Sequence, residues 1–336
     1  MKKSLIVLFL ILFSFQCQNY SKIIPITQTR LLMDTFVQIV VYDQDKSKHE
    51  INRIIGLAFD RIQQIDNITN SYNDSSLISF VNQNGASYQI QMDSVLYHVV
   101  KESQRISTLS KGNFDITTGA VKDLWDFNND NPFVPDSTVI RKTLKLVDYK
   151  LLSIDSDYLG FKTSGMKIDL GAIAKGFAID EAVRILSVHG IHDAMVNAGG
   201  DLKTICTNLT AGKRKVWINH PRNTGEMFGF FRMDSGSVAT SGDYERFFIK
   251  DSIRYHHILD PKTGYPAGKC ISVTIIAKNA LTADALATAV FVMGPEQGMI
   301  FVENQAFIEC IILYKKDGKL IWTASTGIKD KFYLAN

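Results

Sequence analysis

Residues 169–180 read DLGAIAKGFAID and lie where the chain changes from a strand-like run to a helix-like run. Gly171 and Gly176 carry no side chain, so the backbone of this stretch can approach a ligand closely. Asp169 adds a hydrogen-bond acceptor, and Lys175 adds a cation. The residues alone leave two interpretations open: a turn that contacts a nucleotide, and an ordinary strand-to-helix turn with a surface lysine.

This stretch does not match a phosphate-binding P-loop. The pattern G-x-x-x-x-G-K-[ST] places a lysine after the last glycine and a hydroxyl residue after the lysine. Here Lys175 precedes Gly176, Phe177 follows, and the spacing is one residue short. A G-x-G-x-x-G motif does not occur in the chain either. We therefore exclude a Walker-type nucleotide site.

The sequence on both sides of the turn predicts a mixture of helices and strands. Apolar residues at helical spacing predict helices at 49–69, 92–112 and 180–189. After Ala194, short β-branched and aromatic runs predict a series of strands, which a helix-like stretch at 281–294 interrupts. Helices and strands do not alternate regularly. The expected fold class is therefore α+β, a mixed α/β arrangement of sheets flanked by helices, and not a doubly wound sheet.

Composition and charge exclude some classes of function. With 46% hydrophobic residues, the chain can fill a substantial core. Removing Lys2 and Lys3 from the 37 basic residues leaves 35 against 34 acidic ones. The mature protein is thus close to neutral, and no basic patch indicates binding to nucleic acid.

Residues 1–16 have the features of a signal peptide. A basic start is followed by SLIVLFLILFSF, which is too short to span a bilayer as a stable helix. Cys17 follows at the position where bacterial lipoproteins are cleaved and acylated, although Gln16 is larger than the small residue usual there. We expect a lipid anchor at Cys17, with a soluble periplasmic or secreted protein as the alternative.

The rest of the chain is expected to form a short tether at 17–30 and one domain at 31–336. Cys206, Cys270 and Cys310 are widely spaced and form neither a CxxC metal motif nor an obvious disulfide framework. We expect them to be buried thiols.

The helix-like stretch TADALATA, residues 282–289, contains a second candidate site. Asp284 and Thr288 are four residues apart, so on a helix they project from one face. Both are hard oxygen ligands of the kind that suits Mg²⁺. A structural interpretation stays open, because Asp284 near a helix start is favoured by the helix dipole and Thr288 could be buried.

The stretch HHILDPKTGYP, residues 256–266, contains a third candidate. His256 and His257 are adjacent on an expected strand, so they point to opposite faces and cannot both serve one centre. There is no H-E-x-x-H motif and no third ligand at zinc spacing, which disfavours a zinc hydrolase. The tight turn that follows could present one histidine to a site. A structural histidine is the alternative.

Eight segments of the chain occur in the order that the ApbE family shows, and the chain resembles that family from about Met33 to its end. The segments are MDTFVQIVVY, SYNDSSLISFVN, GNFDITTGAVKDLW, KIDLGAIAKGFAID, VNAGGDL, SVATSGDYERFF, HHILDPKTGYP and TADALATAVFVMG. The motifs D-x-G-A-x-A-K-G, H-I-x-D-P-x-T-G and A-D-A-L-A-T-A are the most specific. The family contains FAD:protein FMN transferases of bacterial envelopes.

The resemblance implies an FAD site in a cleft between subdomains. The residues that it assigns to FAD are Met33, Ser71, Tyr72, Asn73, Asp115, Asp169, Lys175 and Ile258. It assigns Mg²⁺ to the carbonyl of Ala172 and to the side chains of Asp284 and Thr288. It also makes Asp284 a catalytic residue and His257 the candidate for proton transfer. Some family members carry a further acidic ligand where Ala287 stands, so the metal here relies more on water or substrate.

The implied reaction is Mg²⁺-dependent transfer of FMN from FAD to a threonine or serine hydroxyl of an exported flavoprotein, with release of AMP. The protein partner would be an envelope redox subunit with a motif similar to D-[GA]-x-[ST]-x-A-[ST]. The alternatives are an FAD pyrophosphatase that gives FMN and AMP, and a non-catalytic flavin-binding lipoprotein. The expected location is the periplasmic side of the bacterial cell envelope, with the lipid anchor as the only membrane attachment.

The stretch DSGSVAT, residues 234–240, loosely resembles the acceptor motif itself. Ser235 replaces the small second residue of the motif, and the same stretch belongs to the fold pattern. Self-modification at Thr240 is therefore the minor interpretation.

Overall fold

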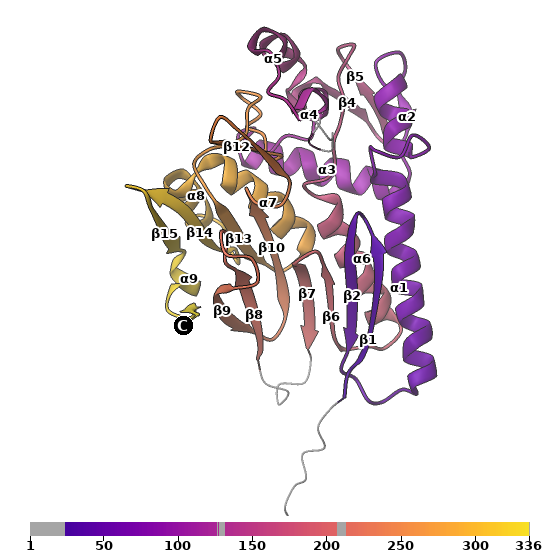
Figure 1. The fold of residues 1–336 in the computed structure, drawn as a ribbon. Coiled ribbons are helices and arrows are strands. Elements are labelled where there is room, and N and C mark those ends of the chain that lie inside the picture. The colour runs from indigo at the N-terminus through magenta and orange to yellow at the C-terminus, as the bar shows by residue number, and fades with distance from the viewer. Residues whose placement is uncertain (1–23, 126, 128–131, 207–212, 336) are drawn as a thin grey trace, which may run out of the picture.

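The computed structural model describes residues 24–125, 127, 132–206 and 213–335. An eight-stranded sheet crosses this part of the molecule (Figure 1). Its strands, in spatial order, are β1 (Ile26–Leu32), β2 (Thr35–Val41), β6 (Asp193–Ala198), β7 (Asp201–Cys206), β10 (Gly236–Gly242), β13 (Ser272–Ala277), β14 (Glu309–Lys316) and β15 (Lys319–Ala324). Every neighbouring pair is antiparallel, which confirms the α+β class.

Both faces of the main sheet are buried, as the alternation along β14 shows. Cys310 and Ile312 point to one face, and Ile311 and Leu313 point to the other. All four side chains are fully buried. A sheet with two apolar faces needs a cover on each side.

Long helices cover one face of the main sheet. In Figure 1 they are α1 (Lys48–Thr69), α6 (Ala174–Val188) and α7 (Ala280–Met293). In α1, Ile51, Ile55 and Ile62 recur at near-helical spacing and are buried against the sheet. The Ser47 side chain caps α1 by accepting a hydrogen bond from the main-chain N–H of Glu50. The predicted helix at 49–69 is therefore confirmed.

A second, smaller sheet covers the other face. It consists of β8 (Arg214–Asn219), β9 (Met227–Met233) and β16 (Tyr333–Leu334), and the short helix α9 (Thr326–Lys329) lies beside it. Val216 and Phe231 of this sheet belong to the same core cluster as Leu313 of the main sheet. The protein thus has a helix layer, a main sheet and a strand layer.

The remaining elements are short apart from α3, and several surround the upper part of the molecule in Figure 1. The helices are α2 (Leu77–Asn84), α3 (Ser94–Leu109), α4 (Gly119–Trp125), α5 (Ser137–Thr143), α8 (Pro295–Glu303) and the 3₁₀ turns η1 (Leu144–Leu146) and η2 (Tyr149–Leu151); the strands are β3 (Ile90–Gln91), β4 (Leu152–Asp155), β5 (Tyr158–Phe161), β11 (Phe247–Lys250) and β12 (Ile253–His256). Trp125, at the end of α4, donates its indole N–H to the Gly264 carbonyl at 2.9 Å.

Three boundaries differ from the sequence prediction. β1 begins at Ile26, inside the range assigned to the tether, because its polar run does not give a clear strand signal. α6 begins at Ala174, so Lys175 lies in the first helical turn and not in a loop before the helix. β12 ends at His256, so His257 does not lie on a strand as expected.

Residues 1–23 lie outside the described residues, and with them the predicted signal peptide 1–16 and Cys17. Within the described part of the chain, none of the helices combines the length and the apolar character needed to cross a membrane. Cys270 and Cys310 are buried as expected, whereas Cys206 is only partly buried and corrects that prediction.

Candidate active site

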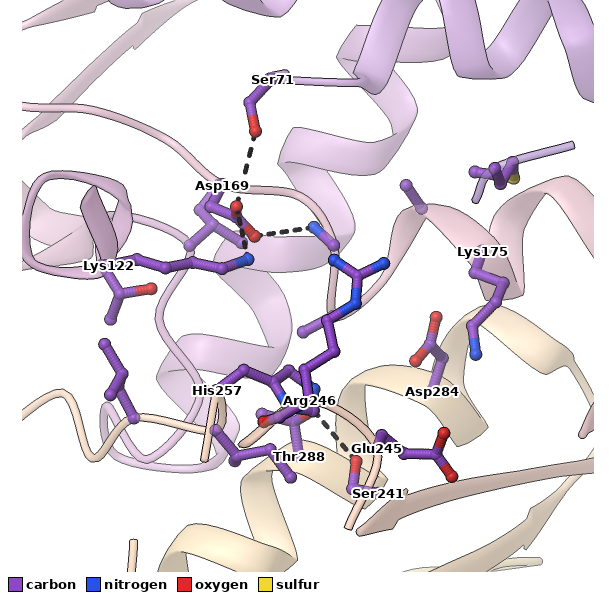
Figure 2. Close-up of a pocket in the computed structure, with 18 of the residues that line it drawn as sticks. Ser71, Lys122, Asp169, Lys175, Ser241, Glu245, Arg246, His257, Asp284 and Thr288 are labelled. Carbon is purple, nitrogen blue, oxygen red and sulfur yellow. Dashed lines mark hydrogen bonds and ion pairs between the residues drawn. The ribbon is translucent and has the colours of Figure 1, made fainter. Parts of the chain in front are cut away.

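A pocket of about 480 Å³ lies at the end of the main sheet where β1 and β2 turn. Its walls come from this turn, the end of α1, the start of α6 and the inner side of α7. The volume is in the range typical of small-molecule sites. Figure 2 shows Asp169 and Lys122 in one part of the pocket, and Asp284 and Lys175 in another. The expected position between two subdomains stays a prediction.

The turn between β1 and β2 contains the first residue predicted to contact FAD. Leu32 pairs with Thr35, so Met33 and Asp34 form a two-residue hairpin loop. Both have positive φ angles, 54° and 56°, as a type I′ turn requires. Residues other than glycine adopt this conformation at a cost of roughly 1–2 kcal/mol each. Such a turn at the wall of a pocket supports a functional role for it.

Asp169 lies in the loop before α6, where three side-chain or main-chain groups hold its carboxylate. Lys122 Nζ donates to Oδ2 at 2.7 Å, Ser71 Oγ donates to Oδ2 at 3.5 Å, and Gly171 N–H donates to Oδ1 at 3.0 Å. Burial raises the pKa of Asp169, but Lys122 and the Gly171 N–H outweigh burial and hold this pKa below its usual value. The carboxylate is therefore ionised and has its own cation.

Asp284 lies on α7 and faces the start of α6. Its Oδ2 accepts a hydrogen bond from the Gly176 N–H at 2.9 Å. Glycine is needed there, because a Cβ on Gly176 would lie 2.3 Å from the Ala280 carbonyl oxygen. Burial and the neighbouring Asp201 raise the pKa of Asp284 well above its usual range, although Lys175 opposes them. A further cation beside this carboxylate is therefore favourable.

Lys175 is shared between two carboxylates. Its Nζ lies 2.6 Å from Asp201 Oδ2. Burial lowers the pKa of Lys175, but Asp201 and then Asp284 raise it above its usual value. Asp201 begins β7, is 3% exposed, and also accepts the Thr240 N–H at 2.9 Å. Sequence reasoning missed Asp201, although the glycine pair before it in VNAGGDL was a signal of a constrained turn.

The surroundings of Asp284 fit a hard cation. Thr288 follows one helical turn later on α7, and its Oγ1 lies 3.3 Å from Ser241 Oγ. Ala172 lines the same pocket and can offer its main-chain carbonyl. Within the described residues there is no cluster of three His, Cys, Asp or Glu that could hold a metal. One carboxylate, hydroxyl groups and a carbonyl suit Mg²⁺, which keeps water and substrate oxygens as its other ligands.

The two adjacent histidines lie in different surroundings. His256 is buried, and its Nε2 lies 3.0 Å from the Ala267 carbonyl oxygen, which indicates a structural role. His257 lines the pocket, with Nδ1 3.3 Å from the Arg246 carbonyl oxygen. Burial and the nearby Lys122 lower the pKa of His257 to about 3. Its ring is therefore neutral at pH 7 and can accept a proton.

Three further predicted FAD residues line the pocket: Ser71, Tyr72 and Ile258. Tyr72 lies just after α1 and is largely exposed. Lys122 Nζ lies 5.8 Å from the centre of its ring. Tyr72 therefore offers an accessible aromatic face at the Asp169 end of the pocket.

Two other predicted FAD residues have structural partners of their own. Asp115 lines the pocket, but its carboxylate already accepts the N–H and the hydroxyl of Thr117, at 2.8 and 2.6 Å, and the N–H of Tyr149 at 2.9 Å. Asn73 is not among the described residues that line the pocket. Its Oδ1 accepts the N–H and the hydroxyl of Ser75. A local side-chain turn accounts for the position of the Asn73 side chain, and its assignment to the FAD site stays a prediction.

The sequence analysis missed several charged residues of the pocket, among them Lys122, Glu245 and Arg246. Lys122 lies on α4, a helix that was not predicted. Arg246 Nη2 lies 3.9 Å from Asp34 Oδ2, and in Figure 2 the side chain projects toward the middle of the pocket. Its guanidinium group suits a phosphate. Because Lys122 is more than a hundred residues away from Glu245 and Arg246, sequence spacing does not bring the two segments together.

Comparisons with known protein sequences point to one family. The model of the ApbE family matches residues 33–312. A relative from Treponema pallidum, named FAD:protein FMN transferase, is 30% identical over 94% of this chain and 91% of its own length.

Comparisons with solved structures agree. The ApbE protein from Thermotoga maritima superimposes with a TM-score of 0.84 and 33% identity, covering 91% of this chain and 99% of that one. The flavinyl transferase ApbE from Pseudomonas stutzeri, solved in its apo form, has a TM-score of 0.81 and 26% identity over 92% and 96% of the two chains. Both similarities extend over nearly complete chains.

Proposed function

The chain belongs to the ApbE family and is an FAD:protein FMN transferase, and on this premise we propose how its pocket works. FMN is transferred from FAD to a threonine or serine hydroxyl of an exported protein, AMP is released, and the reaction depends on Mg²⁺. One observation carries the proposal: a buried carboxylate without a cation of its own, Asp284, shares a pocket with a neutral histidine, His257.

FAD is bound along the pocket, from the Asp169 end to the Asp284 end. Tyr72 offers a face on which an aromatic ring can stack, and Met33 and Ile258 add apolar surface elsewhere in the pocket lining. The diphosphate is attracted by the cations in the pocket, Lys175 and Arg246. The neutralised Asp169 supplies acceptor oxygens without adding net negative charge.

Mg²⁺ would be held by the side chains of Asp284 and Thr288 and by the Ala172 carbonyl. When bound, it neutralises charge on the diphosphate and on the leaving phosphate. Lys175, held by Asp201, keeps positive charge beside the same group. The Gly176 N–H fixes the Asp284 carboxylate, which lines the pocket.

In the transfer step, the acceptor hydroxyl oxygen forms a bond to the phosphorus atom of the FMN half, and the bond from that phosphorus to the AMP oxygen breaks. His257 takes the proton of the hydroxyl group as a general base. A histidine with a pKa of about 3 is a weak base in the free protein. The negative diphosphate beside it raises that pKa and makes proton transfer easier.

The test is incubation of the purified protein with FAD, Mg²⁺ and a peptide that carries a D-[GA]-x-[ST]-x-A-[ST] sequence. We expect a mass increase of one FMN on a hydroxyl residue, measured by mass spectrometry, together with an equal amount of AMP. AMP and free FMN without labelled peptide would instead indicate an FAD pyrophosphatase. Unchanged FAD would indicate a binding protein without turnover.

We also propose that the protein acts on the periplasmic side of a bacterial envelope, attached through a lipid on Cys17. The apolar run in residues 4–15 and the cysteine that follows it support this proposal. Labelling of cells with a fatty-acid probe should mark the wild type and not Cys17→Ser. An unlabelled wild type would leave the soluble periplasmic alternative.

A further inference from the structure

An exposed apolar pair lies beside the mouth of the pocket. Leu31 is 69% exposed, Phe36 is 72% exposed, and the two are cross-strand partners in the β1–β2 hairpin. Between them in sequence, Met33, Asp34 and Thr35 line the pocket. The pair is therefore continuous with the wall of the substrate site. Apolar side chains exposed at such a place indicate contact with another molecule.

The alternation of side chains along β1 explains why Leu31 faces solvent. Gln28 and Arg30 point toward α1, where they hydrogen-bond to Asn52 at 2.8 Å and to Asp60 at 3.3 Å. Leu31 is the next residue, so it points to the opposite face of the strand. That part of the hairpin is not covered by the helix layer.

β1 is also the edge of the main sheet. In the described part of the chain it pairs with β2, and no strand pairs with its outer edge. Proteins normally protect a free edge with polar or charged residues, because it can pair with another chain. Residues 27–30, with the sequence TQTR, provide this protection along most of β1. The exposed apolar pair is confined to the end next to the pocket.

We propose that Leu31, Phe36 and the adjacent free edge of β1 form the docking surface for the acceptor protein. This inference rests on the transfer reaction proposed above. An extended segment of the acceptor adds to the edge of β1, as strands do in β-augmentation. An apolar side chain of that segment packs on the Leu31–Phe36 pair. The threonine or serine hydroxyl then passes Thr35 and enters the pocket.

The proposed FMN transfer requires a surface that holds the acceptor protein near the pocket. Water competes with the acceptor hydroxyl for the same phosphorus atom, and water is in great excess. A hydroxyl group that is held in place reacts at an effective concentration far above its concentration in solution. In the proposed reaction FAD occupies the pocket, so further contacts that hold the acceptor are needed outside it. The Leu31–Phe36 pair supplies apolar surface there.

The test compares two reactions of the same protein: AMP release from FAD without acceptor, and labelling of a synthetic peptide built on the sequence DGATGAT. Leu31→Thr, Phe36→Thr and the double variant keep residues that favour strands. We expect FAD affinity and AMP release to stay within about twofold of the wild type. We expect kcat/KM for the peptide to fall by about tenfold for each single change, and further for the double variant.

Phe307→Asn is the matched control. Phe307 is also 72% exposed, does not line the pocket, and lies between α8 and β14. Its φ of 63° is one that asparagine tolerates. This variant should label the peptide at the wild-type rate. A similar loss in Phe307→Asn would mean that exposed apolar area in general binds the peptide, and would overturn the assignment to Leu31 and Phe36.

Three other results would also overturn the docking surface. The double variant could label the peptide as fast as the wild type. It could lose AMP release together with labelling, which would place the pair in the FAD site. Sedimentation could show a dimer that dissociates in the double variant, which would make the pair a contact between two copies of this chain. A wild type that never labels the peptide would instead contradict the proposed function, and the docking surface with it.

Discussion

Asp169 and Asp284 are both aspartates of the same pocket, yet their surroundings differ. Asp169 has a lysine of its own, Lys122 at 2.7 Å, and its pKa lies below the usual value. Asp284 has no such partner, because the nearby Lys175 is held 2.6 Å from Asp201. Burial and Asp201 therefore raise the pKa of Asp284.

The difference separates two tasks. A carboxylate with its own cation is a fixed structural acceptor, which can shape a binding site without attracting further charge. A buried carboxylate without its own cation favours any cation that enters, because a buried charge is costly until it is paired. We therefore associate the Asp169 end with holding FAD and the Asp284 end with Mg²⁺ and the reaction.

The largest expected effect is the loss of catalytic rate in Asp284→Asn. Asparagine keeps the size of the side chain and an oxygen that can accept the Gly176 N–H, but it removes the negative charge. We expect AMP release from FAD to fall by about a thousandfold, because charge neutralisation of this kind contributes several kcal/mol. FAD affinity, measured by quenching of flavin fluorescence, should change far less.

Asp169→Asn is the matched variant at the other end of the pocket. It should weaken FAD binding more than it slows AMP release at saturating FAD. AMP release at the wild-type rate in Asp284→Asn would remove the assigned metal role. If Asp169→Asn and Asp284→Asn changed FAD affinity and AMP release equally, the two carboxylates would not have the separate roles proposed here.

The second-largest expected effect is the loss of folding stability in Lys122→Met. This substitution leaves the Asp169 carboxylate without its cation in a partly buried position. We expect the free energy of unfolding, measured with urea, to fall by about 2–3 kcal/mol. The double variant Lys122→Met/Asp169→Leu should recover most of this loss, because it removes the unpaired charge as well.

Lys175→Met tests whether the two ends of the pocket respond differently to Mg²⁺. It also leaves carboxylates unpaired, but beside the proposed cation site. We therefore expect added Mg²⁺ to restore much of its stability and to have little effect on Lys122→Met. The measurement is the melting temperature of both variants with and without Mg²⁺. An equal response of the two variants would contradict the assignment of Mg²⁺ to the Asp284 end.

The smallest expected effect near neutral pH is that of His257 on stability, and this effect grows as the pH falls. The pKa of His257 in the folded protein is about 3, below its usual value of 6.5, mainly because of burial and then Lys122. Between these two pH values His257 binds more protons in the unfolded chain than in the folded one, so its contribution to the free energy of unfolding rises with pH. In His257→Gln, the rise between pH 4 and about 6.5 should be smaller.

The control for this pH prediction is His256→Gln. The pKa of His256 is also lowered by burial, but His256 contacts the Ala267 carbonyl and not the pocket. Addition of FAD should therefore change the pH profile of the wild type and of His256→Gln more than that of His257→Gln. Equal profiles of the wild type and His257→Gln would show that His257 is already solvated in the free protein.

Much of the fold was predictable from local pattern. The helix at 49–69 follows from apolar residues at helical spacing, and it occurs as α1. Asp284 and Thr288 were predicted to share a helix face, and both line the pocket from α7. β1 was missed because its sequence, ITQTRLL, has a polar centre and shows little alternation of apolar and polar residues.

The residues that escaped prediction share a different property. Lys122, Asp201 and Arg246 come from three separate parts of the chain, and their partners are distant in sequence. The spacing of residues does not encode a distance of 2.6 Å between Lys175 and Asp201. Asn73 is a different case, because its side chain forms a local turn with Ser75 and its predicted contact with FAD is not tested by that turn.

By itself, the sequence determined the long helices, the family resemblance and the residue types available at the site, because these depend on local spacing and ordered motifs. The tertiary structure alone decided which carboxylate has its own cation, which histidine faces the pocket, and where apolar surface borders it. The physical reason is that burial and the approach of opposite charges set these properties, and both arise only when distant segments pack together.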